Sequence, residues 1–249
     1  MRVLVAASLL ATATPALAAG ADVLFDSGRF AAVPAAAADT AADQTLAARA
    51  LLVVAAYETG DKARALSVIA EAERHADAAI KLAPDDVDAA LQKAIAIGYR
   101  AKLTRSPGGA KVARAMMEKA TLRAPKNALA WASIGGWHAE SVVTLGKFLA
   151  GTMVGAKAKT GLAGYERAVA LAPDSPVFRT LYAISLADLD PDPARLRALL
   201  APAAAGKGGD GFDRMMRDRA RRLLAALGTG DKDALADAAA KARPFAGLK

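Results

Sequence analysis

The chain has no cysteine and only two histidines, His75 and His138, among its 249 residues. The absence of cysteine excludes disulfides, thiolate metal sites, cysteine nucleophiles and the cysteine-linked lipid anchor of bacterial lipoproteins. Two histidines are too few for a multi-histidine metal site, and no serine lies in the setting of a nucleophile triad. The glycine-rich stretch 206–211 lacks the Lys-Ser/Thr ending of a phosphate loop. We therefore expect a non-enzymatic protein without metal or cofactor.

Long apolar runs are also absent, because no stretch after the N-terminal region approaches about 20 uninterrupted apolar residues. We expect no integral membrane segment there. Aromatic residues make up only 5% of the chain, whereas alanine occurs 68 times. Alanine is the strongest helix former and a poor strand former, so the composition favours an all-α fold.

The first 18 residues have the pattern of a secretory signal peptide. A basic second residue precedes an apolar run, and residues 16–18 match the Ala-x-Ala cleavage pattern directly after Pro15. A buried helix or a membrane anchor is the alternative, but the run is short and is interrupted by threonines and proline. The sequence thus predicts cleavage near Ala18/Ala19 and a periplasmic protein without a lipid anchor.

The formal net charge is +8, and the excess is concentrated in residues 85–165, which carry 12 basic and 5 acidic side chains. Export removes nucleic acid from the expected partners. A membrane surface, cell-wall polymers or acidic proteins remain as anionic candidates. The basic stretch, which includes Lys111 and Arg114, is interpreted mainly as a solvated helix face, with an electrostatic docking patch as the alternative.

Three segments, 79–86, 120–127 and 168–175, share one pattern at the end of an expected helix. Each contains Ala-Pro, which stops the helix, followed by Asp, Asn or Ser, which can cap the next helix. Small residues recur five and twelve positions before each proline and would let paired helices approach closely: Ala72, Ala79, Ala113, Ala120, Gly161 and Ala168.

The middle unit carries the clearest motif, with Trp131, Ile134, Gly135 and His138 at the spacing W-x2-L-G-x2-Y, His replacing Tyr. The chain here resembles the tetratricopeptide repeat (TPR) family. That resemblance implies a right-handed α-solenoid of stacked helical hairpins, with Trp131 and Gly135 as packing positions and His138 in the core. His75 is expected to be solvated. The proline spacings of 41 and 48 residues exceed the family period of 34 by whole helical turns.

Long repeats with the sequence Gly-Gly-Trp-His-Ala-Glu at 135–140 also resemble bacterial relatives of the regulator-of-microtubule-dynamics family. The likeness implies no tubulin binding for an exported bacterial protein. The predicted domains are a signal peptide at 1–18, a TPR-like repeat domain at 19–204 and C-terminal capping helices at 205–249. Helices are expected near 22–37, 44–58, 61–82, 86–104, 109–123, 127–149, 160–171, 176–188, 193–204, 212–227 and 231–241.

The first helix of each hairpin lines the inner face of such a solenoid. Counting from the prolines gives the candidate partner-binding residues Leu91, Ile95, Tyr99, Leu129, Gly136, Glu140, Thr180 and Ile184. They are mostly apolar and lack the Lys, Arg and Asn of a carboxylate clamp. Either the protein fills this groove itself, with residues 142–154 or its C-terminal tail, or the groove accepts an apolar guest.

The predicted function is a non-enzymatic periplasmic TPR-type scaffold that binds a protein or peptide partner in the cell envelope. The alternative is a binding protein for a small apolar or lipid-like ligand, serving a transporter. The first follows from the repeat and the missing catalytic groups, and the second from the apolar inner face.

Overall fold

A computed structural model describes residues 19–249 and shows only helices and connecting loops there, which confirms the predicted all-α class. The expected signal peptide lies outside the described residues. The elements are α1 (Ala21–Asp26), η1 (Phe30–Ala32), α2 (Val33–Ala36), α3 (Ala41–Val53), η2 (Val54–Glu58), α4 (Lys62–Leu82), α5 (Val87–Thr104), α6 (Pro107–Arg123), α7 (Ala128–Leu145), α8 (Lys147–Leu149), η3 (Ala150–Val154), α9 (Ala158–Leu171), α10 (Pro176–Leu189), α11 (Pro193–Ala205), α12 (Gly211–Gly228) and α13 (Lys232–Ala242).

The repeated Ala-Pro segments separate consecutive helices as expected. α4, α6 and α9 each end at the residue before the Ala-Pro pair, and a polar residue that follows the proline caps the next helix. Asp86 accepts hydrogen bonds from the backbone of α5, Asn127 accepts one from Ala130, and Ser175 accepts one from Phe178. These bonds satisfy backbone donors that the first turn of a helix leaves free.

Small residues bring the paired helices close together. The five alanines that lie five or twelve positions before the prolines are buried, and α7 packs on α9 through glycines of both helices. A Cβ added to Gly135 would lie 2.8 Å from the backbone nitrogen of Tyr165 and 2.9 Å from the carbonyl oxygen of Gly161. The backbones of these two helices therefore touch, and the prediction that Gly135 permits close approach is confirmed.

Trp131 is less buried than the motif suggested. Its ring packs between the middle and C-terminal core clusters but remains half-buried, and its Nε1 donates to the carbonyl oxygen of Pro125 at 2.9 Å. Trp137 is the buried tryptophan of this helix.

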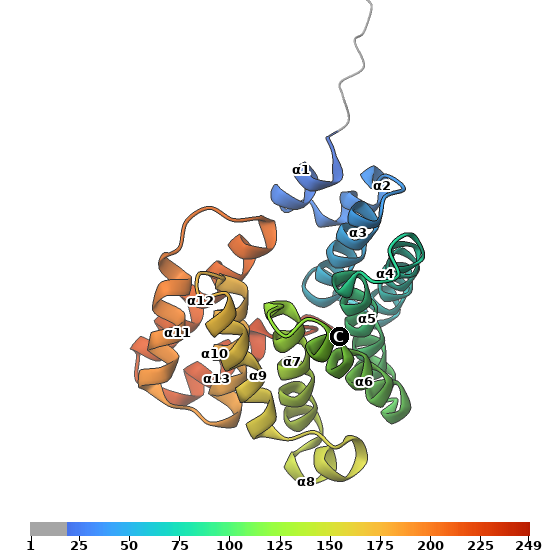
Figure 1. The fold of residues 1–249 in the computed structure, drawn as a ribbon. Coiled ribbons are helices and arrows are strands. Elements are labelled where there is room, and N and C mark those ends of the chain that lie inside the picture. The colour runs from blue at the N-terminus through green and yellow to red at the C-terminus, as the bar shows by residue number, and fades with distance from the viewer. Residues whose placement is uncertain (1–18) are drawn as a thin grey trace, which may run out of the picture.

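The helices stack as successive hairpins, α3 with α4, α5 with α6, α7 with α9, and α10 with α11, in a solenoid-like array (Figure 1). Buried side chains form an N-terminal cluster around Phe25 and Ile69, a middle cluster around Leu91 and Met117, and a C-terminal cluster around Leu200.

Two expected helices are broken at glycines with positive φ. The helix expected at 22–37 is divided into short pieces after Gly28, whose φ is 81°. The helix expected at 127–149 ends at Leu145, because Gly146 has a φ of 78°. Left-handed backbone of this kind is readily adopted by glycine and ends a helix. After Gly146, α8 and η3 protrude at the end of the molecule opposite α1 (Figure 1).

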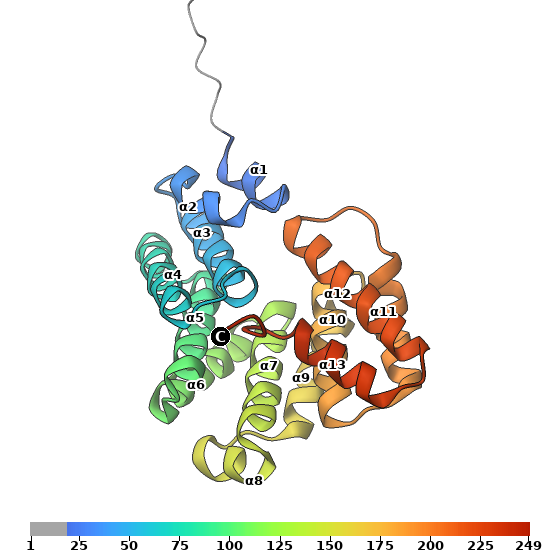
Figure 2. The same cartoon turned by 180° about the vertical axis from the view of Figure 1, so that it is seen from behind.

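The C-terminal part returns to the beginning of the chain. α12 packs on α10 and α11 and also contacts α1, and Asp210, which caps α12, forms an ion pair with Arg49 of α3 at 3.0 Å. The tail after α13 crosses to η2 (Figure 2), where the backbone nitrogen of Phe245 donates to the carbonyl oxygen of Ala56 at 2.7 Å. The stacked hairpins are thus joined end to end around a central space.

Candidate functional site

The central space contains a cavity of about 640 Å³. Most of its wall comes from α3, α5, α7 and α10, and further lining residues come from η2, α6, η3, α9, α12 and the C-terminal tail. Several side chains that line the cavity are only half-buried, because one side of each packs on neighbouring residues and the other faces the cavity. These are Ile95, Leu129, Phe178, Leu181 and Phe212. The surface that they present is predominantly apolar.

Five of the eight inner-face residues predicted from the sequence line this cavity: Ile95, Tyr99, Leu129, Gly136 and Glu140. The other three lie in helix packing. Leu91 is fully buried in the middle cluster, and Ile184 is buried in the C-terminal cluster. Thr180 is also buried and donates to the carbonyl oxygen of Met216 at 3.3 Å. α12 thus covers the face of α10 that an open solenoid would leave free.

Other lining residues lie outside the repeat positions from which the inner face was counted. Leu52 and Tyr57 come from α3 and η2, Met117 comes from α6, and Phe212 comes from α12. Phe212 and Tyr57 contact each other, with ring centroids 5.8 Å apart. They reach the cavity because the chain closes on itself, which the repeat spacing does not signal.

The cavity wall carries a small polar group of side chains. Lys102 of α5 and Glu140 of α7 form an ion pair at 2.6 Å. Burial raises the pKa of the Tyr57 and Tyr99 phenols above the ordinary value, and the negative charge of Glu140 raises both further. Both phenols therefore stay protonated at neutral pH, and each keeps a hydrogen-bond donor in an otherwise apolar wall.

Arg105 lies at the rim of the cavity in an unusual backbone conformation. It follows α5 with a φ of 54°, in the left-handed region where glycine is the common residue. Its side chain is exposed and forms no ion pair with any residue in the described part of the chain. A non-glycine residue held in this conformation is a candidate for a functional role.

The inner face is partly filled by the protein itself. Phe245 of the tail packs edge-on against Tyr99 at 4.9 Å between ring centroids, and the Lys102 ammonium lies 5.8 Å from the Phe245 ring. Met153 and Val154 of η3 contribute to the wall on another side. Both segments that the sequence offered as internal fillers therefore reach the inner face, and the cavity is the volume that they leave.

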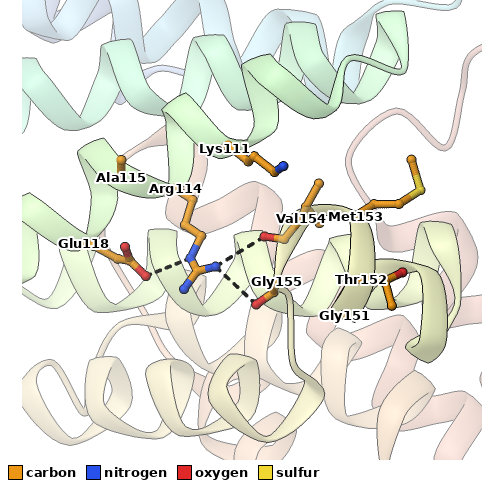
Figure 3. A pocket seen from close by; sticks show the side chains of 9 residues that line it. All are labelled: Lys111, Arg114, Ala115, Glu118, Gly151, Thr152, Met153, Val154 and Gly155. Atoms are coloured by element: carbon orange, nitrogen blue, oxygen red, sulfur yellow. Dashed lines mark hydrogen bonds and ion pairs between the residues drawn. The ribbon is translucent and has the colours of Figure 1, made fainter.

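A second, more open pocket of about 400 Å³ lies between α6 and η3 (Figure 3). Here Arg114 donates from Nη1 to the carbonyl oxygens of Val154 and Gly155, both at 3.3 Å, and from Nε to Glu118 at 2.8 Å. Arg114 therefore connects η3 to α6 by hydrogen bonds, and the prediction that its side chain is merely solvated is wrong. Lys111 is exposed at the same pocket.

The two histidines differ from each other in environment. His138 is 3% exposed, contacts Trp137, and accepts a hydrogen bond at Nδ1 from the backbone nitrogen of Lys157 at 3.2 Å. Burial, together with the positive charge of nearby Arg114, lowers the pKa of His138 to about 4. The predicted core position is confirmed. His75 is half-buried, with Nδ1 2.7 Å from Oε1 of Gln44, so the expectation of a solvated side chain is wrong.

Within residues 19–249, no group of three or more His, Asp or Glu side chains is placed to hold a metal ion. Over the same residues, no helix has both the length and the hydrophobicity needed to cross a bilayer. Neither a protein-family model nor a curated protein sequence matches this chain.

Proposed function

We propose that the protein binds an elongated apolar small molecule, such as a fatty-acid-like lipid, in the central cavity. The observation that carries the proposal is the cavity of about 640 Å³ with its predominantly apolar wall. Small-molecule sites commonly measure about 300–1,000 Å³ and combine apolar walls with a few polar groups. The Lys102–Glu140 pair and the phenols of Tyr57 and Tyr99 are such groups.

A small molecule suits this cavity better than a peptide does. The tail occupies part of the inner face, where Phe245 packs on Tyr99, and the volume that remains, about 640 Å³, lies in the range of small-molecule sites. Arg105, exposed at the rim, is the side chain best placed to pair with an acidic end group. We therefore place the acidic end of the ligand at Arg105 and the apolar part among the side chains of α5, α7 and α10.

The proposal extends to the setting in which binding occurs. We propose that residues 1–18 direct export, that the chain acts in the periplasm, and that the hairpins are divergent TPR-like repeats. The support is the signal-peptide pattern, the motif around Trp131 and the Ala-Pro helix ends. Fractionation of a Gram-negative host and N-terminal sequencing test the export step. A mature chain that begins near Ala19 is expected, and an uncleaved cytoplasmic chain would contradict it.

Titration with parinaric acid, a fluorescent fatty acid, tests the binding proposal. Leu181 lines the cavity and Leu224 does not, although both are half-buried leucines. Leu181→Trp should therefore fill part of the cavity and weaken parinarate binding at least tenfold, whereas Leu224→Trp should leave the Kd within about twofold. Wild-type protein that binds no parinarate, or equal binding by both variants, would contradict the proposal.

Arg105 provides a second test, because its left-handed backbone should lower the stability of the fold whereas its charge should strengthen ligand binding. Arg105→Gly relieves the left-handed conformation and should stabilise the fold by about 1 kcal/mol. The same change removes the rim charge and should weaken parinarate binding, while Arg105→Lys should retain most of it. Thermal unfolding and fluorescence titration measure the two effects separately.

Native mass spectrometry of protein purified from the periplasm separates this proposal from the scaffold predicted from the sequence. A retained small molecule of lipid-like mass is expected. A co-purifying polypeptide, with the cavity empty, would instead favour the scaffold.

A further inference from the structure

We propose that the segment from Gly146 to Lys157, which contains α8 and η3, docks the protein on an anionic lipid surface. The cavity would receive its apolar ligand from that surface. The identity of the cargo rests on the function proposed above, whereas the docking itself does not. We refer to residues 146–157 as the docking segment.

The docking segment exposes large apolar side chains at one end of the molecule (Figure 1). Phe148 is 78% exposed, Leu149 is 49% exposed and Met153 is 41% exposed. No other phenylalanine or tryptophan in residues 19–249 is exposed. Three large apolar side chains within six residues, on a protruding loop, form a compact apolar tip.

The charges within the docking segment and its flanking residues are all of one sign. Residues 141–165 contain Lys147, Lys157 and Lys159 and no Asp or Glu. All three lysines are exposed, and Lys111 of α6 adds a fourth cation beside η3 (Figure 3). The neighbouring Glu118 is paired with Arg114. An apolar tip surrounded by lysines matches a membrane interface, where side chains such as Phe and Leu enter the acyl boundary and lysines meet anionic headgroups.

The size of the tip favours lipid over a protein partner. A stable protein interface buries about 800 Å² on each partner and involves about 20–30 residues. The tip offers three large apolar side chains, which is a small patch for a protein partner. Insertion into a lipid interface requires only that the apolar side chains leave water, and it needs no matching surface.

The docking segment is continuous with the cavity. Met153 is exposed at the tip and also lines the cavity, and the adjacent Val154 is buried in the cavity wall. Arg114 holds the carbonyl oxygens of Val154 and Gly155, and His138 holds the backbone nitrogen of Lys157. A lipid surface at the tip would thus lie next to the wall of the cavity, at a place fixed by α6 and α7.

Sedimentation with vesicles of phosphatidylcholine and phosphatidylglycerol tests the docking. Leu149→Ser and Leu122→Ser are matched variants, because Leu122, on α6 outside the docking segment, is even more exposed at 82%. We expect Phe148→Ser combined with Leu149→Ser to reduce vesicle binding at least tenfold, and Leu149→Ser alone to reduce it severalfold. Leu122→Ser should bind like wild type. Equal losses in Leu149→Ser and Leu122→Ser would overturn the proposal.

A charge reversal with a matched control tests the role of the lysines. Lys147→Glu, Lys157→Glu and Lys159→Glu together should abolish binding to the anionic vesicles. The control changes Lys207, Lys232 and Lys249 to Glu, which alters the net charge equally but lies outside the docking segment, and binding should fall by less than threefold. Equal losses would mean that net charge alone drives binding and would overturn the proposal. Wild-type binding to an acidic protein but not to vesicles would also overturn it.

The transfer of parinarate from vesicles to protein links the segment to the cavity. The Phe148→Ser, Leu149→Ser protein should take up parinarate at least fivefold more slowly from vesicles but bind it with unchanged Kd from solution. Leu181→Trp should show the opposite pattern, with normal vesicle sedimentation and weak parinarate binding. Failure of the cavity proposal would therefore appear as lost parinarate binding with vesicle docking intact, and failure of the docking proposal as the reverse.

Discussion

Gly135 has no room for a side chain, because the backbone of α9 occupies the place of its Cβ. Gly135→Ala must push two helices apart, and we expect a loss of about 1–3 kcal/mol in the free energy of unfolding. Gly108 is the matched control, since nothing lies within 4 Å of its added Cβ. Gly108→Ala should be neutral or stabilise α6 by up to about 1 kcal/mol. Chemical denaturation measures the free energy of unfolding of both variants, and equal values would contradict the close contact of Gly135 with α9.

Arg114 and Lys111 lie one turn apart on α6, and the sequence predicts a solvated helix face for both. Only Arg114 donates hydrogen bonds to the carbonyl oxygens of η3 and to Glu118. Because the guanidinium is half-buried, we expect Arg114→Ala to lower the free energy of unfolding by about 1–2 kcal/mol. Lys111→Ala should change it by only a few tenths. Thermal unfolding of the two variants side by side decides whether the contacts contribute to stability.

At the scale of the element, His138 links α7 to the chain just before α9. The pKa of His138 is about 4 in the folded protein, against the ordinary value of 6.5 for histidine. The unfolded chain therefore binds the proton first as pH falls. The stability contribution of neutral His138 is fully present above about pH 7, declines as pH falls from 6.5, and is lost near pH 4. Arg114 and Lys157 disfavour the protonated ring, while Glu118 favours it. We expect a loss of up to about 3 kcal/mol over this range.

The matched control for this pH dependence is His138→Asn, whose side-chain oxygen can accept the hydrogen bond from Lys157 without titrating. Urea unfolding between pH 4 and 7 should show a shallower loss of stability for the variant than for wild type. Comparing the two proteins removes the contribution of other titrating groups, such as the carboxyl groups of Glu73 and Asp213, whose pKa values burial raises. Parallel curves would contradict the assignment to His138.

The sequence predicts most helices well because their ends depend on local signals. Pro107, Pro176 and Pro193 begin helices, and the Asp, Asn and Ser caps lie directly before the first helical turn. The helix breaks at Gly28 and Gly146 are harder to predict, since an isolated glycine within a helical pattern is tolerated at some positions and ends the helix at others. From the sequence alone, residues 146–149 are expected at the end of a long helix, and residues 146–154 belong to a segment that could fill the groove.

At the scale of the whole molecule, the repeat register correctly places Ile95, Tyr99, Leu129, Gly136 and Glu140 of α5 and α7 at the cavity, but not Leu91, which is buried in the middle cluster. The same counting places Thr180 and Ile184 on an open face, whereas α12 covers that face. A contact between residues more than 150 positions apart, such as that of Arg49 with Asp210, leaves no periodic signal in the sequence. The repeat pattern therefore does not predict the closure of the chain that forms the cavity.

This closure depends on Gly211, the first residue of α12. A Cβ at this position would lie 2.5 Å from the Cα of Gly28 and 2.5 Å from the carbonyl oxygen of Phe25, both parts of the backbone. Gly211→Ala should therefore separate α12 from α1, increase the radius of gyration in small-angle X-ray scattering, and weaken parinarate binding. Gly228, at the other end of the same helix, has nothing within 4 Å of its added Cβ. Gly228→Ala should leave all three properties unchanged, and equal behaviour of the two variants would show that the junction between α1 and α12 does not hold the ring closed.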